Sequence, residues 1–89
     1  MTYKIKYTKQ AVKDLKFFIK SGNKSLLKKV EILIKELENH PYTGTGKPEE
    51  LKYELQGLWS RRINKEHRII YKVEDEVVTV TILSLKGHY

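Results

Sequence analysis

The sequence contains no cysteine, which excludes a disulfide framework and a thiolate metal site. It also has no long apolar run at its start, because lysines recur throughout the first twenty residues. We therefore expect neither a secretory signal nor a membrane-spanning helix. Both absences are compatible with a reducing compartment, and we expect a cytoplasmic protein.

Acidic residues are outnumbered: 18 Lys and Arg face 11 Asp and Glu, for a net charge of +7. A chain of 89 residues has room for one hydrophobic core, so we expect a single domain over residues 1–89. The excess positive charge favours a polyanionic partner such as nucleic acid, although a merely solvated basic surface would have the same composition.

The first half of the chain predicts a strand followed by two helices. Tyr3, Ile5 and Tyr7 alternate with lysines, the period of a half-buried strand. A helical spacing then starts near Thr8 and ends at Gly22. Its predicted apolar face is formed by Ala11, Val12, Leu15, Phe18 and Ile19. Asn23 can cap a second helix, which ends at residues 39–41 because Pro41 disfavours helical geometry in the residue before it.

Residues 42–50 read as a loop, since they contain two glycines and a proline. Beyond the loop the apolar period changes to two, which predicts strands. The predicted inward face carries Leu51, Tyr53, Leu55, Trp59, Ile63, Ile69, Tyr71, Val73, Val78, Val80 and Ile82. The predicted outward face carries Lys52, Glu54, Ser60, Arg62, Arg68, Ile70 and Lys72.

These elements predict an α+β fold, with a two-helix hairpin packed on one face of a twisted, mostly antiparallel sheet of about four to five strands. The place of the first strand in this sheet is left open. If the helices cover the inward face, Lys52, Arg62 and Arg68 emerge together on the open face. Neighbouring strands lie about 4.8 Å apart, so the three cations can converge on a phosphate. The alternative is an antiparallel sheet that simply presents a charged face to water.

Three stretches also carry a family resemblance: K-P-E-x-L-K from Lys47, L-x-G-x-W-S-R-R-I-x-x-E-H-R-I-I-Y from Leu55, and the final H-Y. This combination resembles the YoeB/Txe toxins of bacterial toxin–antitoxin modules, part of the wider RelE-like group. The resemblance implies a RelE-like fold and ribosome-dependent endonucleolytic cleavage of messenger RNA in the decoding site. It also implies a cognate YefM-like antitoxin, with DNA engaged only through that antitoxin, and leaves homodimer formation open. Glu50 and Gly87 depart from the residues that many or some members carry at these positions.

Metal-free RNA cleavage needs a base at the attacking 2′-oxygen, an acid at the departing 5′-oxygen and positive charge on the phosphate between them. Glu49 is the candidate base, and His88 is the candidate acid because it matches the family's penultimate histidine. Arg68 is the candidate phosphate clamp, since a guanidinium fork fits phosphate geometry. Lys52 and Arg62 lie beside it in the predicted sheet.

Other residues have weaker assignments. Lys47 is a candidate RNA contact in the loop, and Tyr89 is a candidate for stacking or positioning. Arg61 is a second candidate RNA contact, but a structural ion pair on the inward side explains it equally well. His67 suits packing or capping, and His40 marks a helix end. The three histidines lack metal-ligand spacing, so we propose neither metal nor cofactor.

Two other functions remain as alternatives. A non-catalytic basic module could bind RNA or the ribosome and block translation, and it would need neither Glu49 nor His88. A DNA-binding regulator is disfavoured, because no predicted helix carries the cation cluster. Trp59 is expected to pack between elements, although an exposed tryptophan would stack on a base.

Overall fold

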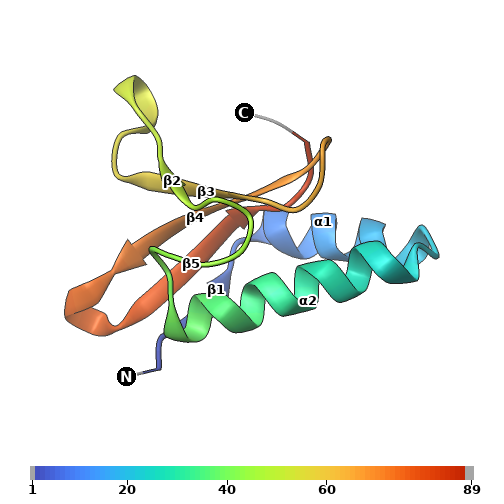
Figure 1. Ribbon diagram of the computed structural model, residues 1–89, viewed down its shortest axis with the longest axis horizontal. Coiled ribbons are helices and arrows are strands. Elements are labelled where there is room, and N and C mark those ends of the chain that lie inside the picture. Colours follow the sequence, from blue (N-terminus) through green and yellow to red (C-terminus); the bar gives the residue numbers. More distant parts are fainter. Residues whose placement is uncertain (1, 88–89) are drawn as a thin grey trace.

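The computed structural model describes residues 2–87, which form one five-stranded sheet with two helices against one of its faces (Figure 1). The elements in chain order are β1 Lys4–Tyr7, α1 Lys9–Lys20, α2 Lys24–Asn39, β2 Glu49–Glu50, β3 Leu58–Arg62, β4 Arg68–Glu74 and β5 Thr79–Ser84, with single 3₁₀ turns η1 Tyr53–Leu55 and η2 Asp75–Val77. The strand order is β1-β5-β4-β3-β2, with β1 parallel to β5 and every other pair antiparallel. The predicted α+β architecture is confirmed, and β1 takes an edge position.

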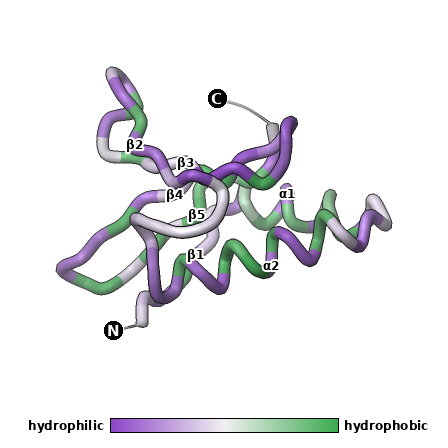
Figure 2. Tube along the Cα trace, in the orientation of Figure 1, coloured by the Kyte–Doolittle hydropathy of each residue, from purple (hydrophilic) through white to green (hydrophobic). Residues whose placement is uncertain are grey.

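Both helices begin at the predicted caps. The Thr8 side chain accepts a hydrogen bond from the Ala11 amide at 3.1 Å, and the Asn23 side chain accepts one from the Leu26 amide at 3.1 Å. Each cap satisfies one of the amides that the first helical turn leaves without an intrahelical partner. Gly22, at φ +73°, supplies the left-handed residue after α1, and α2 ends at Asn39 with His40 as its C-cap just before the proline. Along both helices hydrophilic and hydrophobic residues alternate within each turn (Figure 2).

The buried strip of α1 is rotated from its predicted position. Ala11 and Phe18 are fully buried, but Val12 and Ile19 are 39% and 56% exposed, so their predicted burial is wrong. Asp14 lies in the strip instead and is only 4% exposed. Residues three, four and seven positions apart share a helix face, so Asp14 completes the strip that Ala11 and Phe18 define. The apolar pattern did not reveal this carboxylate.

The inward faces of β3, β4 and β5 follow the predicted alternation. Ile69, Tyr71 and Ile82 are fully buried, and Trp59 and Val73 pack against the same core. The outward face is less exposed than predicted, because Ser60 has no exposed surface and Ile70 is 8% exposed. The open face is therefore buried at these two residues and is not uniformly exposed to water.

The predicted strand at residues 51–55 is wrong. Pairing with β3 begins earlier, at β2, and ends where the Leu51 amide donates to the Leu58 carbonyl at 2.8 Å. The intervening chain turns through η1, with Tyr53 at φ +59° and Gly57 at φ +94°. Tyr53 is 92% exposed, although its spacing predicted an inward position. A reversal directly before β3 needs turn geometry, which overrides the apolar alternation.

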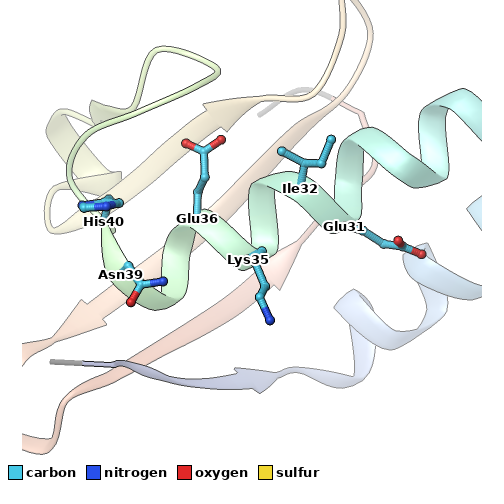
Figure 3. Close-up of a pocket in the computed structure, with 6 residues that line it drawn as sticks. All are labelled: Glu31, Ile32, Lys35, Glu36, Asn39 and His40. Atoms are coloured by element: carbon cyan, nitrogen blue, oxygen red, sulfur yellow. The ribbon is translucent and has the colours of Figure 1, made fainter.

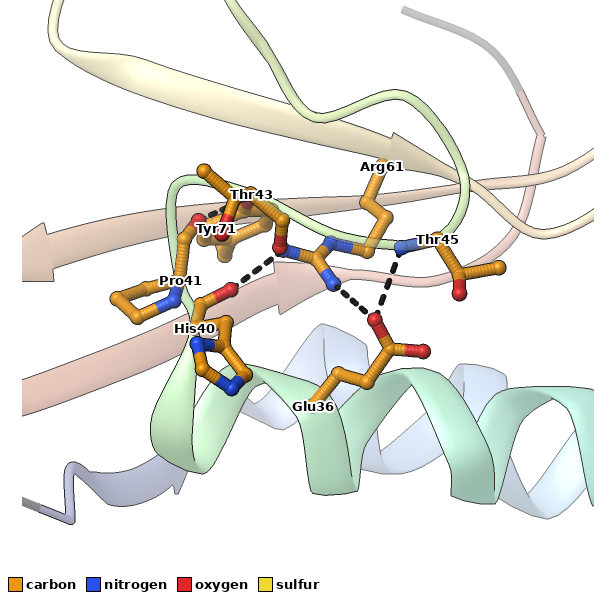
Figure 4. A network of polar contacts seen from close by, with 7 residues as sticks. All are labelled: Glu36, His40, Pro41, Thr43, Thr45, Arg61 and Tyr71. Atoms are coloured by element: carbon orange, nitrogen blue, oxygen red, sulfur yellow. Dashed lines mark hydrogen bonds and ion pairs between the residues drawn. The ribbon is translucent and has the colours of Figure 1, made fainter.

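Arg61 points to the helix side of β3 and joins it to α2 and the following loop (Figure 4). Its side chain is fully buried. The Nη2 group donates to the carbonyls of His40 and Thr43, both at 2.8 Å, and Nη1 lies 3.4 Å from Glu36 Oε1. The same Glu36 oxygen accepts the Thr45 amide at 2.8 Å, and this bond, together with the Arg61 charge, holds the pKa of Glu36 below its ordinary value. The structural ion pair considered for Arg61 is thus present.

Two tyrosine hydroxyls also hold the loop that follows α2. The Tyr71 hydroxyl donates to the Pro41 carbonyl at 2.7 Å, and the Tyr42 hydroxyl donates to Asp75 at 2.7 Å. Burial, followed by this bond to Asp75, raises the pKa of Tyr42 to about 12. The Tyr42 ring also lies edge-on to Trp59, with centroids 5.0 Å apart, so the predicted packing role of Trp59 is confirmed.

Gly46 allows the loop to close on β3. The Arg62 amide donates to the Gly46 carbonyl at 2.8 Å. Gly46 has φ +86°, and a Cβ atom there would lie 2.5 Å from the Arg62 carbonyl oxygen. Only glycine fits both constraints. The loop therefore runs directly along β3 into β2.

This network predicts a pH-dependent effect of Glu36→Gln on stability. At neutral pH the substitution should lower the free energy of unfolding by about 1.5–3 kcal/mol, because Arg61 and Thr45 lose a charged acceptor. Since the pKa of Glu36 is depressed, its contribution is present above the ordinary value of 4.5 and disappears as the pH falls through the lower folded value. Denaturant unfolding across this range should show parent and variant converging in acid. Glu31→Gln, on the exposed side of α2, is the matched control, and a constant gap at all pH values would contradict the assignment.

Candidate active site on the open face of the sheet

The strand register gathers three of the predicted residues on the face opposite the helices. Glu49 pairs with Ser60, and Arg62 pairs with Arg68. Opposed residues of antiparallel strands point to the same face, and successive residues alternate. Because Arg61 points toward the helices, Glu49, Arg62 and Arg68 share the open face.

Two arginines lie directly opposite each other on neighbouring strands of the open face. Arg62 and Arg68 are cross-strand partners, an arrangement that like charges disfavour. Arg68 is half-buried, and its Nη1 lies 3.5 Å from Ser60 Oγ, the residue opposite Glu49. The guanidinium of Arg68 therefore reaches the residue of β3 that is paired with Glu49. A phosphate placed there would meet a base candidate on one side and fixed positive charge on the other.

Lys47 and Lys52 flank Glu49 along the chain, and both are exposed. Lys47 adopts a left-handed conformation at φ 51° in the loop before β2. Lys52 lies between β2 and η1 rather than on a strand, so its predicted strand position is wrong, although it remains next to the site. A hollow lined by Glu49, Glu50, Leu51, Lys52, Tyr53 and Leu55 opens at this edge. The exposed Tyr53 ring beside it offers a surface on which a base can stack.

The C-terminal segment returns to the start of β4. Gly87 is the last described residue, and its carbonyl accepts the Arg68 amide at 3.3 Å. Its own amide donates to His67 Nδ1 at 2.8 Å. The described chain thus ends beside Arg68. His88 and Tyr89, the predicted acid and stacking residue, lie outside the described residues.

Other predicted roles separate clearly. Arg61 is enclosed on the helix side, where its ion pair accounts for its charge, and the structure does not bring it to the open face. His67 packs on Phe18, with ring centroids 5.1 Å apart, as the packing alternative predicted. His40 caps α2. The sequence did not reveal that Asp14 and His67 bind the backbone of residues 85–87, because these contacts join distant parts of the chain.

A second hollow lies along the outer surface of α2 (Figure 3). It is lined by Glu31, Ile32, Lys35, Glu36, Asn39 and His40. Because α2 covers the opposite face of the sheet from Arg68, this hollow is separate from the candidate site. Within residues 2–87 no group of three or more metal-ligating side chains comes together. Across the same residues, no helix combines the length and apolarity needed to cross a bilayer.

Comparisons with known proteins agree with this geometry. Residues 7–89 match the family model of the YoeB-like toxins of bacterial type II toxin–antitoxin systems. The Toxin YoeB of Synechocystis sp. is 43% identical over 86 residues, covering 97% of this chain and 96% of the relative. The Toxin YoeB of Escherichia coli K12 is 45% identical over 67 residues, covering 75% and 77% of the two chains.

Solved structures give the same result at the level of the fold. The YoeB/ParE toxin from Agrobacterium tumefaciens superposes with a TM-score of 0.88 at 32% identity, covering 97% of this chain and 99% of that chain. The YoeB dimer from Staphylococcus aureus superposes with a TM-score of 0.83 at 41% identity, with both chains fully covered. A YoeB–YefM complex from the same organism has a TM-score of 0.82 at 41% identity, again covering both chains in full. With the family model, these likenesses show that the chain belongs to the YoeB-like toxins of bacterial type II toxin–antitoxin systems.

Proposed function

We propose that this toxin is a ribosome-dependent endoribonuclease that cuts messenger RNA in the decoding site and so inhibits translation. The observation that carries the proposal is the shared open face of Glu49, Arg62 and Arg68, with the described end of the chain at Arg68. The proposed base and phosphate clamp share this face, and the described chain ends beside it, one residue before the proposed acid His88.

The reaction uses the RNA's own 2′-hydroxyl as the nucleophile. Glu49 takes the proton of this hydroxyl as the 2′-oxygen bonds to the adjacent phosphorus. Arg68 neutralises the charge that develops on the non-bridging oxygens. His88 gives a proton to the 5′-oxygen as the phosphorus–oxygen bond breaks. The products are a 2′,3′-cyclic phosphate and a free 5′-hydroxyl, and the step requires neither metal nor cofactor.

The exposure of the site supports a requirement for the ribosome. Glu49, Lys47, Lys52 and Arg62 are all exposed, so water screens their charges. Excluding water from such a site strengthens each electrostatic interaction within it. A host surface that covers the open face would supply that exclusion and hold the RNA in line for attack.

The partners follow from the family and the relatives. The S. aureus relative is known in complex with YefM, and we propose a YefM-like antitoxin for this chain. The same relative is known as a dimer, and we propose that two copies of this chain also pair. The antitoxin restrains the toxin, and DNA is reached only through the antitoxin.

A non-catalytic RNA-binding module is the second candidate, because the cation cluster alone would support binding. The register of Glu49 favours the enzyme. In an enzyme, a carboxylate beside the bound phosphate serves to take a proton. In a pure binding module the same negative charge would only repel the ligand.

Glu49→Gln should lower the single-turnover rate of messenger cleavage on ribosomes by about 10²–10⁴-fold, the usual contribution of one acid–base group. Ribosome binding should change little. Glu50→Gln is the matched control, since Glu50 pairs with Trp59 and points to the other face of the sheet. Equal rates for both variants and the parent would favour the non-catalytic module.

The cations should divide into two classes. Arg68→Ala should reduce the cleavage rate by about 10²–10³-fold, more than it reduces binding, because its charge meets the developing phosphorane. Arg62→Ala and Lys52→Ala should weaken binding and flatten its salt dependence by roughly 0.7 in log–log slope for each lost phosphate contact. Rates and affinities measured at several salt concentrations would test this division. Identical, binding-level losses at all three positions would contradict it.

A further inference from the structure

The segment that precedes His88 is held by three consecutive backbone amides. The amides of Leu85 and Lys86 donate to Asp14 Oδ2 at 2.9 and 3.2 Å. The next amide, of Gly87, donates to His67 Nδ1 at 2.8 Å. We call Asp14, His67 and residues 85–87 the tail clamp. Its contacts fix the course of the chain from the end of β5 to Gly87.

Asp14 is unusual because it is a carboxylate inside the apolar strip of α1. It is 4% exposed, and its other oxygen accepts the Gln10 side-chain amide at 2.8 Å. Burying a carboxylate is costly unless hydrogen bonds compensate, and amide bonds to an ionised acceptor are stronger than neutral ones. An apolar side chain would suit the strip for packing alone. The carboxylate adds a defined position for the backbone of Leu85 and Lys86.

His67 completes the clamp from the other side of the tail. Its own amide donates to Asn64 Oδ1 at 2.7 Å, and its ring packs on Phe18 of α1. Because Nδ1 accepts a hydrogen bond from the Gly87 amide, this nitrogen carries no proton. That hydrogen bond and the packing on Phe18 set the orientation of the His67 ring. The neighbouring Arg68 amide donates to the Gly87 carbonyl. Gly87 is therefore held through both its amide and its carbonyl by two successive residues.

The clamp ends immediately before the proposed acid. Gly87 has φ +81°, a left-handed conformation that turns the chain at the point where it lies beside Arg68, the first residue of β4. The Lys86 ammonium lies 3.8 Å from the centroid of the Phe17 ring, a further attachment to α1. The next residue is His88.

We propose that Asp14 and His67 are positioning residues for catalysis. They fix Gly87 at the start of β4, beside Arg68, and so set the point from which the chain continues to the proposed acid, His88. The proposal rests on the acid role of His88 in the proposed function. Neither Asp14 nor His67 touches RNA.

Two substitutions at His67 separate this role from simple packing. His67→Asn places an amide oxygen near the position of Nδ1 and keeps an acceptor for the Gly87 amide. His67→Leu keeps apolar volume against Phe18 but has no acceptor. We expect His67→Leu to lower the single-turnover cleavage rate on ribosomes by about 10²-fold, the effect of displacing a reacting group by about 1 Å, with ribosome binding unchanged. His67→Asn should retain more of the rate, even if it melts at a lower temperature.

Hydrogen exchange observed by NMR tests the clamp without relying on activity. The Gly87 amide should exchange slowly in the parent and in His67→Asn, and faster in His67→Leu. Asp14→Asn, which weakens the acceptor and keeps its size, should speed exchange at Leu85 and Lys86 and lower the cleavage rate. It gives an independent test if His67→Leu does not fold.

The outcomes distinguish the two proposals. Loss of exchange protection together with loss of cleavage rate supports the positioning role. A His67→Leu protein that cuts as fast as the parent, or that protects the Gly87 amide equally, overturns it. A parent that cuts no messenger contradicts the proposed function, and the exchange rates still decide whether the clamp exists.

Discussion

The buried guanidinium of Arg61 is the interaction on which the site's geometry depends. A charge taken out of water is tolerated only with well-placed partners, and Arg61 finds them in Glu36 and the carbonyls of His40 and Thr43. These partners belong to the end of α2 and to the loop that leads to β2. The guanidinium also lies 6.0 Å from the centroid of the Tyr71 ring on β4. One side chain therefore sets the distance between helix layer, loop and sheet.

The same side chain fixes which residues face the open side. Side chains alternate along a strand, so an inward Arg61 forces Ser60 and Arg62 outward. A slip of one residue would reverse every assignment and bury Arg62 in place of Arg61. Cross-strand pairing then carries the choice to Glu49 and Arg68. The exposed cations are thus placed by a cation that no RNA can reach.

At the candidate site, two chain segments attach to the strands that carry Arg62 and Arg68. The loop before β2 is bonded to β3 through Gly46, and the segment after β5 is bonded to β4 through Gly87. In both attachments the donor is the backbone amide of one of the two arginines, Arg62 or Arg68. The opposed arginines on β3 and β4 are disfavoured by their like charges, and such local conflicts are expected where function constrains the sequence.

Much of the fold could be predicted from local patterns. Thr8 and Asn23 gave the helix starts because side-chain caps act within three residues, and the alternation at residues 69–73 gave the inward face of β4. The strand predicted at residues 51–55 is wrong, because Leu51, Tyr53 and Leu55 have the alternation of a strand although the chain reverses there. Asp14 was missed because its value comes from amides more than seventy residues away along the chain.

The candidate site was predicted unevenly for the same reason. Arg62 and Arg68 followed from alternation, whereas Lys52 lies outside the strands. Glu49 followed from the family resemblance and then from its pairing with Ser60. Arg61 remained ambiguous until its partners on α2 were located. No local pattern relates His67 to residue 87, since the contact arises only when β5 returns beside β4.

The most direct test of the central claim is to map the ends of a messenger after incubation with ribosomes and this protein. We expect a 5′ fragment ending in a 2′,3′-cyclic phosphate, or the 3′-phosphate that forms from it, with a cut at a codon in the decoding site. Replacing the 2′-hydroxyl by hydrogen at that position should abolish the cut. A 3′-hydroxyl end, or cleavage that persists without the 2′-hydroxyl, would contradict attack by the RNA's own hydroxyl on the open face of the sheet.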